Sequence, residues 1–416
     1  MLLHPVDTAS TAVAELEDQM REWWASGVDV YGLFMRKLDD TITAMDEGLF
    51  TEKDRVDMAS TYPVRDTGTV YRPAPSEKTS RYAAYFAKVY VYQNSRLPPN
   101  LPSLRLHPQT FALFRLAAQY SRDVYYKPMH RDSWSYVGSD WRHGTKAMMI
   151  KSVAVADMNT VVLAIRGTQS FRDWAVNVKT APTSPNGFLD DPSNACHAGF
   201  LSVAQNMIHP VASRLRKLIA ANPGRAPYSL LITGHSAGGA VASLLYCHML
   251  SLTARSELAH LASFFKSVHC VTFGAPPVSI RPLFPPPSPS QQRSAFFSFV
   301  NEGDPVARAD KTYVTSLLNL YASPTPHWCR KYSWCPRKDK PAVWRVPAAP
   351  LSLAGQIVVL RARSNYYSLP GEGPEGVEAC LTNDLGLRQI VFGDPLMHAM
   401  ALYARRIDEL TTEAYR

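Results

Sequence analysis

Residues 229–239 of the chain, Ser-Leu-Leu-Ile-Thr-Gly-His-Ser-Ala-Gly-Gly, decide its fold. Their apolar start predicts a buried strand, and the apolar residues that follow predict a buried helix. Between the two, Gly234, Ser236 and Gly238 fit the pattern Gly-x-Ser-x-Gly, which is typical of a sharp strand-to-helix turn. Such a turn lifts the serine hydroxyl above the sheet, and small residues on both sides avoid steric clashes. Two interpretations follow: Ser236 is a nucleophile, or the turn is a glycine-rich connection with an inert serine.

The same elements account for residues 230–254, which contain no Asp, Glu, Lys or Arg. A stretch of this length resembles a membrane span, but Gly-His-Ser-Ala-Gly-Gly near its start would interrupt one. We therefore expect a buried strand, a tight turn and a buried helix here.

Strand and helix patterns alternate on both sides of the turn. This alternation predicts a mostly parallel central sheet flanked by helices, and with the serine turn it indicates the α/β-hydrolase fold. Strands are expected at residues 147–157, 160–165, 228–233, 268–273 and 296–300, and helices at 112–126, 203–221 and 237–253.

The N-terminal quarter follows a different pattern. Apolar residues at helical spacing over residues 8–54 predict a helical extension, and proline-marked loops follow it. We therefore divide the chain into an N-terminal helical extension with a linker at 1–108 and an α/β-hydrolase catalytic domain at 109–416. Residues 307–390 are expected to form an insertion in this domain.

Composition excludes several classes of protein. The chain has 416 residues, of which 46% are hydrophobic and 19% charged, so global disorder is excluded. A net charge of +9 suits nucleic acid or an anionic membrane surface, but no helix-turn-helix, zinc-finger or RNA-binding motif occurs. We therefore expect no nucleic-acid partner. No Cys/His cluster has zinc spacing and no phosphate-binding loop occurs, so neither a metal nor a cofactor is expected.

The N-terminus and the cysteines bear on location. The first ten residues lack a basic region followed by an apolar run, and no Asn-x-Ser/Thr sequence occurs in the chain. We expect an intracellular protein, either cytosolic or peripheral to membranes. Cys247 and Cys270 lie inside apolar runs and are expected to be buried thiols. For Cys329 and Cys335, a disulfide and two free thiols both remain open.

Four blocks of sequence resemble the class 3 lipases, a family that includes fungal triacylglycerol lipases, diacylglycerol lipases and some plant phospholipases. The order and spacing of the blocks also match, and the resemblance covers roughly residues 110–405. The blocks are Ala164-Ile-Arg-Gly-Thr-Gln-Ser-Phe-Arg-Asp-Trp174, His197-Ala-Gly-Phe200, Ile232-Thr-Gly-His-Ser-Ala-Gly-Gly239 and Val271-Thr-Phe-Gly-Ala-Pro276.

The oxyanion of an acyl-transfer intermediate needs positioned hydrogen-bond donors. In this fold one donor is the N–H of the residue after the nucleophile, here Ala237. The resemblance places the second donor of the oxyanion hole at Thr168, just past an expected strand. It also implies a lid over residues 169–182, with Phe171 and Trp174 as lid and substrate-binding residues. A fixed surface helix remains the alternative to a lid.

Chain order in this fold, serine then acid then histidine, excludes the seven histidines before Ser236 as general base. Of the five that remain, His248 lies in an expected helix and His269 in an expected strand, where a loop-borne base does not fit. His260 precedes any plausible acid, which leaves His327 and His398. The resemblance favours His398, at the entry to a late helix, and Asp304 as the acid just after a strand. Together with Ser236 they complete an expected catalytic triad. Glu302 is the competing carboxylate, for which we expect a solvent-facing position. His197 matches a structural position of the family.

These residues predict a serine hydrolase that cleaves carboxylic esters of lipids through an acyl-enzyme. The substrate classes implied are triacylglycerol, diacylglycerol and phospholipid acyl esters. One alternative keeps the chemistry, as a small-ester esterase or an acyltransferase. A second alternative is a non-catalytic lipase-like scaffold for lipid binding or signalling, against which the presence of candidates for all three triad positions argues.

Residues 327–345 combine aromatic and basic side chains between the expected acid and base. Such side chains favour peripheral contact with an anionic membrane or a lipid droplet. The alternative is a solvated basic loop whose tryptophans pack on the domain. The residues concerned are Trp328, Tyr332, Trp334, Trp344, Arg330, Lys331, Arg337, Lys338, Lys340 and Arg345.

Overall fold

A computed structural model describes residues 86–126, 136–140, 144–155, 158–167, 181–221, 228–287, 294–323, 342–363 and 376–416. The helical extension predicted over residues 8–54 lies outside the described residues. Thr168, His327, Cys329 and Cys335 also lie outside them.

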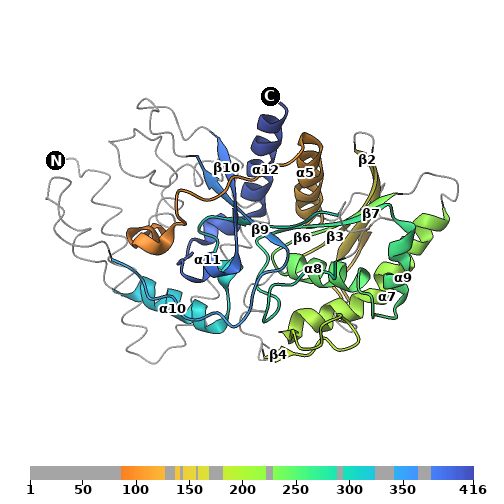
Figure 1. Cartoon of the computed structure of the whole chain (residues 1–416), viewed down its shortest axis with the longest axis horizontal. Helices are drawn as coiled ribbons and strands as arrows, with labels where there is room; N and C mark the ends of the chain where they lie inside the picture. The colour runs from red at the N-terminus through yellow and green to blue at the C-terminus, as the bar shows by residue number, and fades with distance from the viewer. Residues whose placement is uncertain are drawn as a thin grey trace.

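Within the described part, eight strands form one sheet in the order β1-β2-β3-β6-β7-β8-β9-β10 (Figure 1). Neighbouring strands from β3 to β9 run parallel, and the strands outside this range pair antiparallel. The fold class expected from the sequence is therefore confirmed. The strands are β1 (Tyr136–Val137), β2 (Met148–Val155), β3 (Met158–Ile165), β6 (Ser229–His235), β7 (Ser267–Phe273), β8 (Phe296–Asn301), β9 (Gln356–Ala362) and β10 (Val377–Thr382), with β4 (Pro182–Thr183) and β5 (Cys196–His197) as a separate pair.

Helices cover both faces of the sheet. Helices α5 and α12 lie on one face, and α7, α8 and α9 lie on the other (Figure 1). Side chains alternate between the two faces of a strand, so each face of the sheet needs a cover. In β6, Leu230 and Ile232 belong to the core under α7 and α8, whereas Leu231 belongs to the core under α5 and α12. The helices are α5 (Pro108–Asp123), α7 (Ala198–Ala220), α8 (Ala237–Met249), α9 (Glu257–Leu261), α10 (Lys311–Ala322), α11 (Asp384–Arg388) and α12 (Met400–Ala414), with 3₁₀ helices η1 (Ala87–Val91), η2 (Gln93–Ser95), η4 (Ala262–Phe264), η6 (Pro305–Arg308) and η8 (Pro395–His398).

The strand register brings several chain turns to one edge of the sheet. Ile165 pairs with Gly234, and Phe273 pairs with both His235 and Phe299. The loops that leave β3, β6, β7 and β8 therefore start side by side at their carboxyl ends, where ligands bind in open parallel sheets.

The apolar stretch 230–254 contains β6 and α8, as expected. Among the described residues no helix has both the length and the apolar character that a membrane span requires.

Two segments differ from the sequence expectations. Residues 307–390 do not form a mere insertion, because they contribute β9 and β10 to the central sheet. At the other end, Phe86, Val89 and Tyr92 lie within the expected extension and linker at 1–108 but belong to the same core cluster as α8. Both differences arise from pairing or packing between distant parts of the chain.

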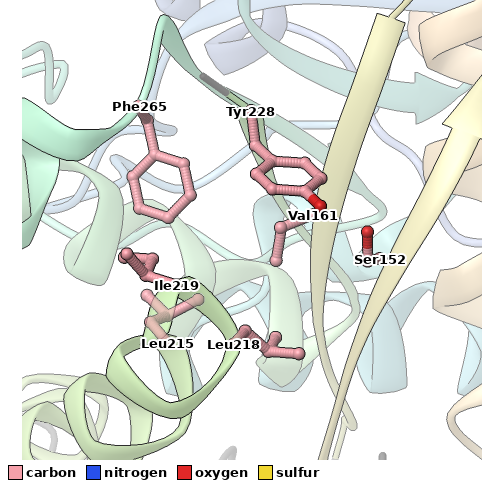
Figure 2. Close-up of a pocket in the computed structure, with 7 residues that line it drawn as sticks. All are labelled: Ser152, Val161, Leu215, Leu218, Ile219, Tyr228 and Phe265. Carbon is pink, nitrogen blue, oxygen red and sulfur yellow. The ribbon is translucent and has the colours of Figure 1, made fainter. Parts of the chain in front are cut away.

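A small apolar cavity lies at the opposite end of β6 from the serine turn (Figure 2). Its volume is about 10 Å³, which is near the lower limit for one water molecule. Figure 2 shows Phe265 and Tyr228 on one side of this space and side chains of α7 on the other. It is lined by Ser152, Val161, Leu215, Leu218, Ile219, Tyr228 and Phe265, and we assign it no function.

Candidate active site

Ser236 occupies a strained turn between β6 and α8. Its φ of 56° and ψ of −134° make it the one non-glycine residue with positive φ among the described residues. Such a conformation costs about 1–3 kcal/mol and persists only where neighbouring structure holds it. Here the Ser236 N–H donates to the carbonyl oxygen of Phe273 over 2.9 Å. The backbone at this residue is therefore held by the neighbouring strand.

Steric constraints require glycine at positions 234 and 238 of the turn. A Cβ on Gly234 would lie 2.5 Å from the carbonyl carbon of Gly238. A Cβ on Gly238 would overlap the carbonyl oxygen of Ile165, at the end of β3. Any larger residue would therefore push the start of α8 away from the sheet edge.

The loop after β3 passes directly beside Ser236. A Cβ on Gly167 would lie 3.4 Å from the Cβ of Ser236 and 2.9 Å from the carbonyl oxygen of His235. Ala237, the first residue of α8, is buried. Thr168 follows Gly167 in the chain but lies outside the described residues, as do residues 169–180 of the expected lid, with Phe171 and Trp174.

Asp304 and His398 form a buried pair at the same edge. Nδ1 of His398 lies 2.9 Å from Oδ2 and 3.1 Å from Oδ1 of Asp304. The two side chains are 0% and 1% exposed, so solvent does not screen this contact. Asp304 precedes η6 and its Oδ1 accepts from the N–H of Val306 over 2.8 Å. Nε2 of His398 has no hydrogen-bond partner among the described residues.

Tyr403 and Asn301 hold this pair from α12 and β8. The Tyr403 hydroxyl donates to Oδ2 of Asp304 over 2.6 Å and accepts from the Asn301 N–H over 2.8 Å. The Asn301 side chain donates to the Met397 carbonyl oxygen over 2.8 Å. Burial, with the negative charge of Asp304, raises the pKa of Tyr403 well above its ordinary value, so the phenol stays a donor.

Gly274 links the pair to the serine turn. It follows Phe273, whose carbonyl oxygen accepts from the Ser236 N–H. The Gly274 N–H donates to the carbonyl oxygen of Phe299 on β8 over 2.9 Å. A Cβ on Gly274 would lie 2.8 Å from Oδ2 of Asp304 and 2.9 Å from Nδ1 of His398. The structure thus brings Asp304 and His398 to the edge that carries Ser236.

His235 is a residue that the sequence reasoning passed over, because histidines before Ser236 were excluded as bases on chain order. It is fully buried, and its Nε2 lies 2.8 Å from the carbonyl oxygen of His398. Its Nδ1 lies 3.0 Å from the hydroxyl of Tyr125. Its place inside the serine motif, next to the nucleophile, was the signal that could have identified it.

His248, His269 and His197 lie elsewhere in the fold and hydrogen-bond to nearby backbone or serine groups. His248 contacts the Phe188 carbonyl and Ser256, and His269 contacts Ser267 and the Ala295 N–H. His197 accepts from the Phe200 N–H at the start of α7.

The expectation of a solvent-facing position for Glu302 is wrong. Its side chain is 10% exposed and accepts from the Leu97 N–H over 2.9 Å, with Arg96 also nearby. Its contacts are with this N-terminal segment.

Two cysteines lie in the strands and helices that carry this edge. Cys247 and Cys270 are buried free thiols, as predicted. Within the described ranges, no group of three His, Cys, Asp or Glu side chains is arranged to hold a metal ion.

Sequence comparison identifies relatives of this chain. Residues 162–313 match the family model for Lipase (class 3), which confirms the resemblance predicted from the four blocks. The chain is 28% identical over 143 residues to phospholipase A(1) DAD1, chloroplastic, of Arabidopsis thaliana, a match that covers 32% of each protein. It is 37% identical over 95 residues to the secreted mono- and diacylglycerol lipase A of Penicillium cyclopium, which covers 22% of this chain and 28% of the relative. The chain thus spans about a third of the length of the curated relatives it matches.

Solved structures of lipases are also similar. The lipase from Rhizopus microsporus var. chinensis shows 16% identity and a TM-score of 0.39, over 72% of this chain and 93% of that chain. The triacylglyceride lipase of Rhizomucor miehei shows 19% identity and a TM-score of 0.39, over 71% of this chain and 96% of that chain.

Proposed function

We propose that this chain, whose residues 162–313 carry the class 3 lipase pattern, is a serine hydrolase that cleaves carboxylic esters of lipids. One observation carries the proposal: a buried Asp304–His398 pair lies at the sheet edge where strained Ser236 emerges. A nucleophile, a base and a group that orients the base are the parts that acyl transfer through a serine requires.

The proposed reaction proceeds through an acyl-enzyme. Nε2 of His398 takes the proton of Ser236 as Oγ forms a bond to the ester carbonyl carbon, and Asp304 stabilises the resulting imidazolium. The N–H groups of Ala237 and Thr168 hold the oxyanion. The carbon–oxygen bond to the alcohol then breaks, and the imidazolium protonates the leaving alcohol. Water, deprotonated by His398, releases the fatty acid and restores Ser236.

Support for a lipid substrate comes from the relatives. One is named as a phospholipase A(1) and another as a mono- and diacylglycerol lipase. We propose triacylglycerol, diacylglycerol or phospholipid acyl esters as substrates, with residues 169–182 as a lid that includes Phe171 and Trp174. An amphipathic lid would turn its apolar face to lipid on opening.

A fluorophosphonate probe tests the chemistry, because it reacts only with an activated serine. We expect the wild type to be labelled and to release fatty acid from dispersed diacylglycerol, and Ser236→Ala to do neither. Ser243→Ala is a matched control, since this second buried serine lies on α8, two turns after Ser236, and donates to the Gly239 carbonyl over 3.0 Å. Labelling of Ser236→Ala at the wild-type rate would refute the nucleophile.

The same assay separates the alternatives. Turnover of a water-soluble short-chain ester without turnover of dispersed diacylglycerol would indicate a small-ester esterase. Transfer of the acyl group to an added alcohol in preference to water would indicate an acyltransferase. An unlabelled wild type would favour a lipid-binding scaffold.

We also propose that residues 327–341 bring the enzyme to an anionic membrane or a lipid droplet, where such esters reside. Aromatic and basic side chains favour this surface. Trp344 takes no part, because its ring packs against Tyr92 at 5.3 Å between centroids and its Nε1 donates to Ser316 over 2.9 Å. For Trp344, packing on the domain is therefore the correct alternative.

A further inference from the structure

His235 has two hydrogen bonds that define its protonation. The His398 carbonyl oxygen can only accept, so Nε2 of His235 carries the proton and donates over 2.8 Å. Nδ1 of a neutral imidazole is then an acceptor, and the Tyr125 hydroxyl donates to it over 3.0 Å. The ring is thus held at both nitrogens, by Tyr125 just beyond the end of α5 and by His398 on η8.

A neutral His235 is what the neighbouring base requires. Burial, with the nearby His398, lowers the pKa of His235 well below its ordinary value. The two rings lie 4.5 Å apart between centroids, so a charge on His235 would oppose the charge that His398 acquires when it takes the serine proton. The rings of Tyr125 and Tyr403 also lie beside His235, at 5.9 and 6.1 Å between centroids.

Tyr125, which donates to His235, also contacts the loop that carries the proposed oxyanion donor. A Cβ on Gly167 would overlap the Tyr125 hydroxyl, so phenol and loop are in direct contact one residue before Thr168. The Arg166 guanidinium lies over the Tyr125 ring at 5.5 Å from its centroid. One run of contacts therefore joins the β3 loop, Tyr125, His235 and the backbone of His398.

We propose that His235 is a positioning residue for the general base, and that Tyr125 holds it in the tautomer that donates to the His398 carbonyl. This inference rests on the proposed function of Ser236, Asp304 and His398. The bond fixes the main chain of His398, and so places the ring that must meet Ser236. Because His235 directly precedes Ser236, the base is positioned from the nucleophile's own strand.

Two amide substitutions separate the two nitrogens of His235. In His235→Gln the amide nitrogen lies near the place of Nε2 and still donates to His398, whereas in His235→Asn the amide lies near Nδ1 and leaves that carbonyl without its donor. We expect His235→Asn to lower kcat by about 10- to 100-fold at nearly constant KM, since small misplacements of a catalytic group have effects of this size. We expect His235→Gln to restore most of kcat.

The results distinguish this inference from the function itself. Equal kcat for the Asn and Gln variants, in an active wild type, would overturn the positioning role and leave the proposed function intact. An inactive, unlabelled wild type would instead refute the function. Should His235→Asn fail to unfold cooperatively, Tyr125→Phe decides, with its exposed neighbour Tyr126→Phe as the control. A fall in kcat of about threefold or more in Tyr125→Phe alone supports the proposal, and no fall overturns it.

Discussion

The Tyr403 hydroxyl donates to Oδ2 of Asp304 over 2.6 Å, and the same carboxylate oxygen lies 2.9 Å from Nδ1 of His398. Tyr403 lies on α12, which begins two residues after His398. The last helix therefore positions the proposed acid as well as the proposed base.

Replacing Tyr403 by Phe should lower both kcat and stability. A hydrogen bond to a buried charged group contributes about 1.5–3 kcal/mol, and the change also removes the acceptor of the Asn301 N–H. We expect a lower melting temperature and a kcat reduced with little change in KM. Thermal unfolding and steady-state ester hydrolysis check this, and a Phe variant as active as the wild type would show that Asp304 is held by its other contacts.

Replacing Gly274 by Ala should inactivate the enzyme more than it destabilises it. The new methyl would lie within 3 Å of both Asp304 and His398, and φ of +54° costs a non-glycine residue about 1–2 kcal/mol. Gly376→Ala is the matched control, since its φ is +91° and its nearest neighbour atom would lie 3.6 Å away. We expect both variants to lose stability but only Gly274→Ala to lose kcat. Similar kcat values in the two would argue against the clash.

Replacing His398 by Ala should be as damaging to hydrolysis as replacing Ser236, because nucleophile and base act as one unit. His327→Ala is the comparison, since chain order and the expected elements together left both histidines as candidates. The measurement is kcat/KM on a single ester, with thermal unfolding to confirm the fold. An inactive His327→Ala beside an active His398→Ala would reverse the assignment.

Buried histidines should make the fold sensitive to acid. Burial lowers the pKa of His197 and of His269 from 6.5 to about 4. Below pH 6.5 the unfolded chain binds protons that the folded chain does not, so the free energy of unfolding falls as pH drops, until about pH 4. The slope is up to about 1.4 kcal/mol per pH unit for each histidine.

Denaturant unfolding at pH 7, 6 and 5 measures this dependence. His269→Asn, which keeps a polar group near the Ala295 N–H, should be less stable at pH 7 but show a shallower slope. A slope equal to that of the wild type would mean that His269 titrates alike in both states.

Changing Arg330, Lys331, Arg337 and Lys338 together to Gln should weaken binding to anionic vesicles. Each basic residue near such a surface contributes about 1 kcal/mol, and salt screens the attraction. We expect the loss on anionic vesicles to be greatest at low salt, with neutral vesicles unaffected. Hydrolysis of a water-soluble ester is the control for folding, and unchanged vesicle binding would favour a solvated loop.

Local sequence was enough to predict the turn at Ser236. Part of its constraint is local, as the clash between a Cβ on Gly234 and Gly238, four positions along the chain, shows. The alternation of strands and helices around it likewise predicted the layered sheet, because side-chain periodicity is a local property. Chain order and the expected helices and strands then reduced the candidates for the base to two histidines, and resemblance to a family chose between them.

The sequence did not predict β9 and β10 within residues 307–390, because strand pairing is not local. Strand β9 pairs with β8 across the intervening α10, and β10 pairs with β9. A short apolar run such as residues 356–362 has the same pattern whether it lies in a loop or in the centre of a sheet. Only the strands that pair with it on either side determine whether such a run becomes a central strand.

The contacts that hold the proposed base and acid in place depend on tertiary structure alone. His235 contacts residues 110 and 163 positions away in the chain, and Tyr403 lies 99 positions from Asp304. No pattern in one sequence indicates that such residues meet. They meet because the parallel strands end at one edge, where burial excludes water and these polar groups hydrogen-bond to one another instead.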